Sequence, residues 1–220
     1  MVRKVRVDSG KVKTPADLRG LKLGLAGGRS ATMAYYTNLV LRPASVGLKD
    51  VDIVDLIFPN AVAALKNGSI DASFLPDPFR TEVLRQGIAV ALAGPGNVGH
   101  SAVVTLYGAK FIQQRPDVAK AAMVALMQGA RDLQGPSAKS DENLAIISKY
   151  TKLPMETLKA SDSYAYDPNL TPDTDTVLDM QRLFLAEGQL SYSSPLPADR
   201  LIDGSFSKYA AEKLGPYKGQ

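Results

Sequence analysis

A glycine-rich turn that follows an apolar segment is the part of this sequence best suited to chemistry. Leu21–Ala26 reads as a buried strand, a helical segment begins near residue 30, and between them lies the run Gly27-Gly28-Arg29-Ser30-Ala31-Thr32. A strand that leads through such a turn into a helix directs unpaired backbone N–H groups at whatever lies there. Gly28, Arg29, Ser30, Ala31 and Thr32 are therefore predicted to hold an anion or another strong hydrogen-bond acceptor.

The same turn also has a purely structural interpretation. Its glycines can simply make a tight turn, with Ser30 as the N-cap of the following helix. Arg29 could pair with a sulfonate, carboxylate or phosphate, but a solvated residue at a helix start is the interpretation we favour for it. The turn lacks the Lys-Ser/Thr ending of a P-loop, and the sequence has no GxGxxG motif there, so nucleotide binding is not predicted.

Four further side chains are candidates for ligand contact. Asp77 and Phe79 follow a predicted strand, and they are weighed equally as ligand contacts and as an N-cap carboxylate with a packed ring. Asp77 facing a ligand would favour an amine or a protonated heterocycle. Asn60 is interpreted first as a helix cap and second as an amide lining a cleft. His100 lies at a predicted hinge, where a lone histidine is more often structural than a ligand contact.

Composition argues against catalysis and against a resident metal. The chain has no cysteine and one histidine, which leaves no thiolate or histidine metal site, and no cofactor is predicted. The acid pairs Asp50/Asp52 and Asp173/Asp175 lie in predicted loops or helix starts and form no dyad with a reason for a raised pKa. The net charge of +4 comes from scattered basic residues, so nucleic acid is not an expected partner.

The periodicity of the sequence predicts an α/β fold with a parallel sheet covered by helices on both faces. Strands are expected at 5–7 (an edge strand, Val5–Val7), 21–26, 51–57, 70–75, 88–93 and 101–107. Later helices are expected at 116–133, 141–150, 154–161, 172–187 and 205–214. Asp71 is expected to be a structural carboxylate, and Gly68 to end the helix that Asn60 begins. Right-handed crossovers would place the turns at 27–32, 59–60 and 76–79 along one edge of the sheet.

The order of several motifs resembles one known family. Thr14-Pro15-Ala16-Asp17-Leu18-Arg19-Gly20, the turn Gly28–Thr32, Ala44–Leu48, the Ala63-Ala64-Leu65 to Asp71-Ala72 motif and Asp77-Pro78-Phe79 resemble the solute-binding proteins of ABC transporters. The similar subgroup binds nitrate, aliphatic sulfonates, taurine or thiamine-precursor pyrimidines. The resemblance implies capture of a small polar solute by hinge closure and delivery to a membrane permease. It also implies a periplasmic or membrane-anchored extracytoplasmic parent protein.

The resemblance also implies a division of the chain. Residues 1–13 would form a strand crossing between lobes, 14–94 a complete second lobe, 95–110 the return crossover and hinge, and 111–220 the helical C-terminal part of lobe one. About 100 residues of lobe one, roughly one small domain, and any export signal would be absent upstream. We therefore expect weak ligand binding and self-association through exposed lobe-one surface.

Two rival functions share these features. An effector-sensing domain of a transcription regulator can have the same lobe topology, but it would need a helix-turn-helix segment that the sequence lacks. An enzyme could use the Gly28–Thr32 turn as an anion site, with only Asp77 or His100 available as an acid or base. Tyr164 and Tyr166, with Tyr35 and Tyr36, could stack on a flat ligand, although tyrosines at helical spacing or in loops more often pack.

Overall fold

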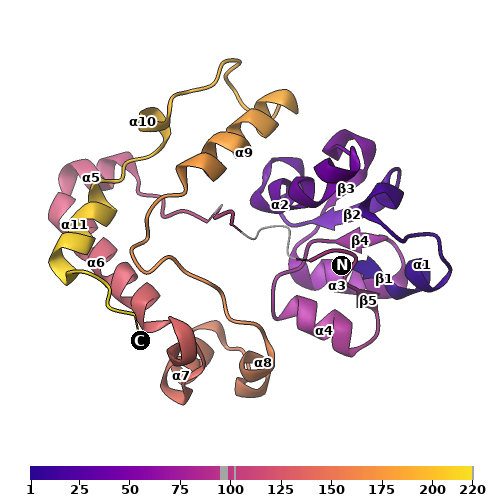
Figure 1. Cartoon of the computed structure of the whole chain (residues 1–220), viewed down its shortest axis with the longest axis horizontal. Helices are drawn as coiled ribbons and strands as arrows, with labels where there is room; N and C mark the ends of the chain where they lie inside the picture. The colour runs from indigo at the N-terminus through magenta and orange to yellow at the C-terminus, as the bar shows by residue number, and fades with distance from the viewer. Residues whose placement is uncertain (95–98, 102, 220) are drawn as a thin grey trace. The chain divides into compact units, whose positions relative to one another are not determined.

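The computed structural model describes residues 1–94, 99–101 and 103–219 and divides into two compact units. The first unit comprises Met1–Ala102 and Asp175–Pro195, and the second comprises Val103–Thr174 and Leu196–Gln220. Each unit is described by itself below (Figure 1). The four-part division expected from the sequence stays a prediction, but the structure adds one fact to it. Residues 175–195 belong to the first unit, where Phe184 packs with Tyr35, Tyr36 and Leu39.

The first unit is built on a five-stranded sheet in the order β3-β2-β4-β1-β5. Its strands are β1 (Val2–Arg3), β2 (Lys22–Leu25), β3 (Asp52–Asp55), β4 (Ala72–Ser73) and β5 (Ala89–Val90). β2 runs parallel to β3 and β4, whereas β1 is antiparallel to β4 and β5. The predicted α/β fold class is confirmed, with a sheet that is rich in parallel pairs and has one antiparallel strand in its interior.

Helices cover both faces of this sheet because neighbouring residues of a strand point to opposite sides. Leu23 and Leu25 are buried in one apolar cluster together with residues of α2 (Thr32–Leu41). Gly24 faces the other side, where an added Cβ would lie 2.6 Å from Ile70 Cδ1. Ile70 belongs to a second cluster with α3 (Phe58–Asn67) and α4 (Phe79–Arg85). The prediction of helices on both faces is confirmed.

The second unit is helical in its described residues. It contains α5 (Ala109–Gln114), α6 (Pro116–Asp132), α7 (Asp141–Thr151), α8 (Met155–Ala160), α10 (Ala198–Leu201) and α11 (Ser205–Leu214). The longest of these, α6, packs on α11 through a core that includes Met123, Met127 and Ala210. The helices predicted for this region are confirmed to within a few residues at their ends. No helix of the described residues is both long and apolar enough to cross a membrane.

The edge strand predicted at Val5 and Val7 is wrong. These residues form the short helix α1 (Lys4–Asp8), and the strand is the preceding pair Val2–Arg3, which lies inside the sheet. Arg6 explains the helix, because its Nε donates to Asp71 Oδ1 at 2.8 Å across 65 positions of sequence. Asp71 also accepts the N–H of Lys22 at 3.1 Å, so the prediction that Asp71 is a satisfied structural carboxylate is confirmed.

The apolar strand predicted at 101–107 is also wrong for the residues that the structure describes. Residues 103–107 adopt no regular secondary structure, and Ala102 lies outside the described residues. Val103 and Leu106 are 78% and 86% exposed. High β-propensity is not enough to form a strand without a neighbouring strand to pair with.

Candidate functional site

The candidate site is the edge of the sheet at which three parallel strands end. Leu25 of β2 pairs in register with Asp55 of β3, and Gly24 pairs with Ser73 of β4. The carboxyl ends of β2, β3 and β4 therefore lie side by side, as predicted. The turns that follow them carry the predicted site residues Gly28–Thr32, Asn60, Asp77 and Phe79. In open α/β sheets this edge is where ligands bind.

The turn after β2 depends on two consecutive glycines in the left-handed region. Gly27 has φ 83° and Gly28 has φ 67°. The Gly27 N–H donates to Asp55 Oδ1 at 2.8 Å, which ties the turn to the end of the neighbouring strand. An added Cβ on Gly27 would lie 2.5 Å from the Cβ of Ala31. Glycine is thus required at Gly27 for its φ and for the close approach of the helix start.

The N-terminus of α2 is left open by its own sequence. Its N-cap is Ala31, in extended conformation, and no side chain caps it, so the alternative in which Ser30 is the N-cap is wrong. Within the described chain, the N–H groups of Thr32 and Met33 have no protein acceptor, because the first bonds of the helix start at Ala34. The Ser30 and Thr32 side chains lie at the same end, so the turn presents hydrogen-bond donors and the positive end of a helix dipole.

Arg29 is engaged with the protein and not with this opening. Its Nη1 donates to the carbonyl of Leu48 at 2.8 Å and its Nη2 to the carbonyl of Val51 at 2.9 Å. These bonds fasten the turn to the loop that leads into β3. The guanidinium therefore shapes the turn, and Arg29 is left out of the ligand set proposed below.

The other two turns place their candidates differently from the prediction. Asn60 is not a cap: α3 begins at Phe58 after the N-cap Ile57, and Asn60 is an exposed residue in its first turn. Asp77 precedes the N-cap Pro78, yet it performs a capping role, because its Oδ1 accepts the N–H of Thr81 at 3.0 Å and the Thr81 hydroxyl at 2.6 Å.

Phe79 packs against the ring of Phe58, with ring centroids 5.4 Å apart. Both rings lie against the apolar cluster of α3 and α4. The alternative of a packed ring is thus the one that the geometry supports for Phe79. The predicted C-terminal glycine of α3 is confirmed, since Gly68 caps the helix with φ 85°.

His100 joins a polar cluster that the sequence did not predict. Its Nδ1 lies 3.1 Å from Thr176 Oγ1 and 3.5 Å from the Tyr35 hydroxyl. Tyr35 donates to Asp179 Oδ2 at 2.9 Å, and Arg42 donates to the same oxygen at 2.9 Å. The cluster links α2, His100 and α9 (Thr174–Ala186). No sequence signal points to Asp179, which lies 144 positions from Tyr35, or to Thr176, which lies 76 positions from His100.

Electrostatics favours one protonation state of the Tyr35–Asp179 pair. Burial raises the pKa of Tyr35 to about 12, assisted by its hydrogen bond to Asp179. Burial alone would raise the pKa of Asp179, but the hydrogen bonds from Tyr35 and Arg42 outweigh it and lower that pKa from its ordinary value. The tyrosine thus stays a neutral donor and the aspartate an anionic acceptor, which holds α9 on α2.

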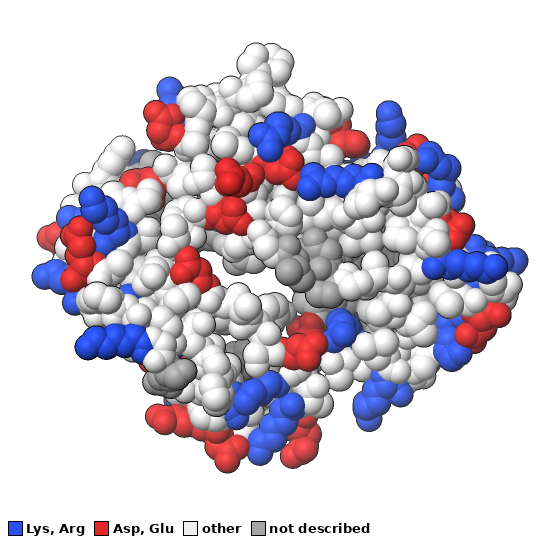
Figure 2. Space-filling view, viewed as in Figure 1, with Lys and Arg blue, Asp and Glu red and all other residues white. Residues whose placement is uncertain are grey.

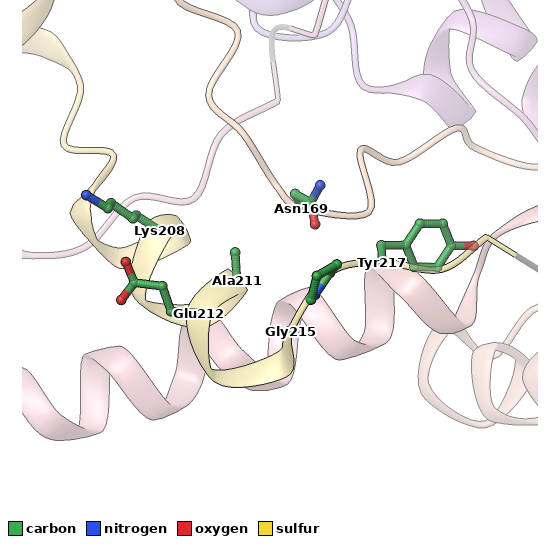
Figure 3. Close-up of a pocket in the computed structure, with 7 residues that line it drawn as sticks. Asn169, Lys208, Ala211, Glu212, Gly215 and Tyr217 are labelled. Carbon is green, nitrogen blue, oxygen red and sulfur yellow. The ribbon is translucent and has the colours of Figure 1, made fainter.

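The described residues contain no cluster of three or more His, Asp or Glu side chains suited to a metal ion. Acidic and basic side chains are interspersed over the visible face of each unit, which gives no large area of one sign (Figure 2). A shallow pocket of about 630 Å³ lies in the second unit. Lys208, Ala211 and Glu212 of α11 line it, together with Asn169 and the chain around Tyr217 (Figure 3). No predicted site residue belongs to it.

The two requirements for glycine at position 27 can be separated by mutation. Gly27→Ala is expected to lower the free energy of unfolding by about 2–3 kcal/mol, from left-handed strain plus the contact with Ala31. Gly20→Ala is the matched control, because Gly20 has φ 73° and nothing within 4 Å of its added Cβ, so only about 1 kcal/mol of strain is expected. Urea unfolding measures both, and equal losses would contradict the close approach of Ala31 to Gly27.

Comparison with known proteins places this geometry in a family. Residues 12–148 match the model of the NMT1-like family, and no curated protein sequence matches the chain. The alkanesulfonate-binding protein SsuA from Xanthomonas axonopodis pv. citri, solved bound to MOPS, superposes with a TM-score of 0.68 at 20% identity. That match covers 90% of this chain and 67% of SsuA.

Two other solved structures show the range of proteins with this fold. The periplasmic nitrate-binding protein NrtA from Synechocystis PCC 6803 has a TM-score of 0.74 at 16% identity, covering 97% of this chain and 64% of NrtA. The desulfurization enzyme DSZB has a TM-score of 0.57 at 15% identity, covering 97% and 75%. This chain thus spans about two thirds of the length of the two binding proteins. Because the family model matches more than half of the chain, this protein belongs to the NMT1-like family, and its fold is that of periplasmic binding proteins such as SsuA and NrtA.

Proposed function

We propose that this protein binds a small polar solute at the carboxyl edge of β2, β3 and β4, as the solute-binding component of an ABC importer. The observation that carries the proposal is the uncapped start of α2, whose Thr32 and Met33 N–H groups lack an acceptor within the described chain. The fold shared with SsuA and NrtA supports it. The parent protein would then act outside the cytoplasm and deliver its solute to a membrane permease. Hinge closure stays a prediction from the resemblance.

The donors at this edge favour an anionic head group. Ser30 and Thr32 supply hydroxyls beside two free N–H groups, and the helix dipole adds positive potential. In the sequence, Asp77 facing the ligand would have favoured an amine as that ligand. In the structure, its carboxylate is already hydrogen-bonded to Thr81 and lies 3.6 Å from the guanidinium of Arg80. A sulfonate or nitrate is therefore the first choice, and a taurine-like zwitterion or an aminopyrimidine is the second.

An enzyme is the second candidate, because DSZB shows that a catalyst can have this fold. It would need an acid or base at the edge, and the two on offer are engaged: Asp77 with Thr81, and His100 with Thr176 and Tyr35. We propose binding without turnover. Product analysis after incubation with alkanesulfonates and arylsulfinates checks this, and solute conversion that His100→Ala abolishes would favour the enzyme.

Calorimetric titration with methanesulfonate, nitrate, taurine and an aminopyrimidine tests the proposal. Saturable binding of at least one anion is expected. In the Ser30→Ala/Thr32→Val double variant its affinity should fall by about tenfold or more, because two donors to a charged group are lost. Thr151→Val is the control, since this exposed residue belongs to the second unit, where its hydroxyl donates to the Ile147 carbonyl at 2.7 Å and accepts the Leu153 N–H at 3.3 Å. Absence of binding by all four solutes, or equal affinities in double variant and control, would contradict the proposal.

A further inference from the structure

A carboxylate stands beside the hydrogen-bond donors at the start of α2. Asp55 is the last residue of β3 and pairs in register with Leu25, the last residue of β2, so it lies at the carboxyl edge of the sheet. The two strands are neighbours in the sheet (Figure 1). Asp55 Oδ1 accepts the N–H of Gly27 at 2.8 Å. No motif marks Asp55 in the sequence, because its place at the site depends on the register of β3 against β2.

The contacts of the glycine turn limit how far this charge lies from the helix start. A Cβ added to Gly28 would lie 3.6 Å from Asp55 Cβ and 3.9 Å from its Cγ, so the carboxylate lies along the turn. A Cβ added to Gly27 would lie 2.5 Å from the Cβ of Ala31, the N-cap of α2. With standard bond lengths, the contacts of Gly27 place Asp55 Oδ1 within about 8 Å of the Ala31 Cβ. Charges this close interact appreciably at physiological ionic strength.

The negative charge of Asp55 has no cationic partner among the residues that the structure describes. Its carboxylate forms no ion pair there, and its only hydrogen bond within the described chain is the one from Gly27. Arg29, the cation of the turn itself, donates to the carbonyls of Leu48 and Val51. An amide or hydroxyl oxygen could accept the Gly27 N–H equally well. The turn therefore accounts for an acceptor at position 55 but not for a charge.

We propose that Asp55 selects the charge of the solute, admitting monoanions and disfavouring dianions at the start of α2. The inference rests on the proposed function and concerns the same anion site. The helix start offers about half a positive charge and neutral donors, which suit a single negative charge. A second negative charge on the solute would meet the Asp55 carboxylate with no free cation of the turn to balance it. At about 8 Å this repulsion corresponds to about threefold to thirtyfold in affinity, for effective dielectric constants between 80 and 20.

Methanesulfonate and sulfate are matched probes of this selection, because both are tetrahedral sulfur oxyanions and sulfate carries one more charge. In calorimetric titration of the whole chain at neutral pH, methanesulfonate is expected to bind at least about threefold more tightly than sulfate. Asp55→Asn keeps an acceptor for Gly27 and removes the charge. It should raise the affinity for sulfate about threefold to thirtyfold more than the affinity for methanesulfonate. Asp55→Ser keeps a hydroxyl acceptor and should give the same shift, so the result does not depend on one variant folding well.

Asp52→Asn is the matched control. It makes the same change in net charge on the same strand, at the other end of β3 and about 10 Å from Asp55. Asp52 lies there 3.7 Å from the ammonium of Lys22. The ratio of the two affinities should stay at its wild-type value in this variant, whereas a merely structural Asp55 would affect both anions alike.

The outcomes separate this inference from the proposed function. Wild-type protein that binds sulfate as tightly as methanesulfonate would overturn the selection by Asp55 and leave anion binding intact. The same holds if both Asp55 variants keep the wild-type ratio of affinities, or if Asp52→Asn shifts it as much as they do. If neither methanesulfonate, nitrate nor sulfate binds, the proposed anion site itself is wrong, and the inference falls with it.

Discussion

Replacing Ala31 with aspartate is expected to stabilise the protein and at the same time to abolish anion binding at α2. Ala31 occupies the N-cap in extended conformation, and alanine is among the poorest N-cap residues. An aspartate there can accept the N–H of Met33 or Ala34 and complement the helix dipole, worth about 0.5–2 kcal/mol. Its carboxylate would occupy the donors proposed for the solute, so affinity should fall by more than about tenfold. Thermal unfolding and calorimetric titration measure the two effects.

Gly108→Asp provides the control for this variant. Gly108 is the N-cap of α5 in the second unit, also extended, with open space around its added Cβ. The same carboxylate at this uncapped helix should stabilise the protein without changing solute affinity. A substitution that raises the stability of the protein and lowers its affinity for the solute indicates a site that is left open for a ligand. Unchanged affinity in Ala31→Asp, with its stability raised, would contradict the assignment of the solute to α2.

Removing the carboxylate of Asp179 is expected to cause the largest loss of stability in the polar cluster. Asp179→Ala leaves the hydroxyl of Tyr35, which is fully buried, without the acceptor 2.9 Å away, and it removes the partner of Arg42. The loss of the buried tyrosine's hydrogen bond to a charged acceptor accounts for most of the expected loss of about 2–3 kcal/mol, since exposed ion pairs contribute little. Asp175→Ala, an exposed position on the same helix, should change stability by less than about 0.5 kcal/mol.

The pH dependence of unfolding gives an independent check of the same cluster. Because the folded pKa of Asp179 lies below the ordinary aspartate value of 3.8, its stabilisation is present above that pH and is lost as pH falls further. Because the folded pKa of Tyr35 is raised from 10.0 to about 12, its stabilisation is present below pH 10 and is lost between these values. Tyr35→Phe should remove the alkaline loss and reduce the acid one, because the Tyr35 hydroxyl is the foremost of the contacts that lower the pKa of Asp179. If the loss of stability at alkaline pH is unchanged in Tyr35→Phe, ionisation of Tyr35 is not its cause.

Local signals predicted the elements whose partners are close in sequence. Leu23 and Leu25 on one face of β2, with Gly24 on the other, specify a strand buried on both sides. Gly68 in the left-handed region ended α3 where predicted. The outer boundaries of α6 followed from Pro116 and the helical period. The parallel order of β2, β3 and β4 then placed the three turns on one edge, because consecutive crossovers share a hand.

The predictions that are wrong concern elements decided by distant partners. Val5 and Val7 alternate with charges as an edge strand would, but the ion pair from Arg6 to Asp71 favours a helical turn instead. Pro59 and the apolar Phe58 start α3 earlier than Asn60 indicates, because a proline fits the first turn of a helix. No periodicity within α9 could show that Asp179 would bind α2, since that contact joins residues 144 positions apart.

The central claim is that the free N–H groups at the start of α2 bind an anionic solute. Titration of the ¹⁵N-labelled protein with methanesulfonate or nitrate, followed by amide chemical shifts, tests it most directly. The account predicts that the amides of Thr32 and Met33 show the largest saturable shifts and that Ala31→Asp abolishes these shifts. Saturable shifts confined to other regions, such as the pocket beside Tyr217, with Thr32 and Met33 unchanged, would contradict it.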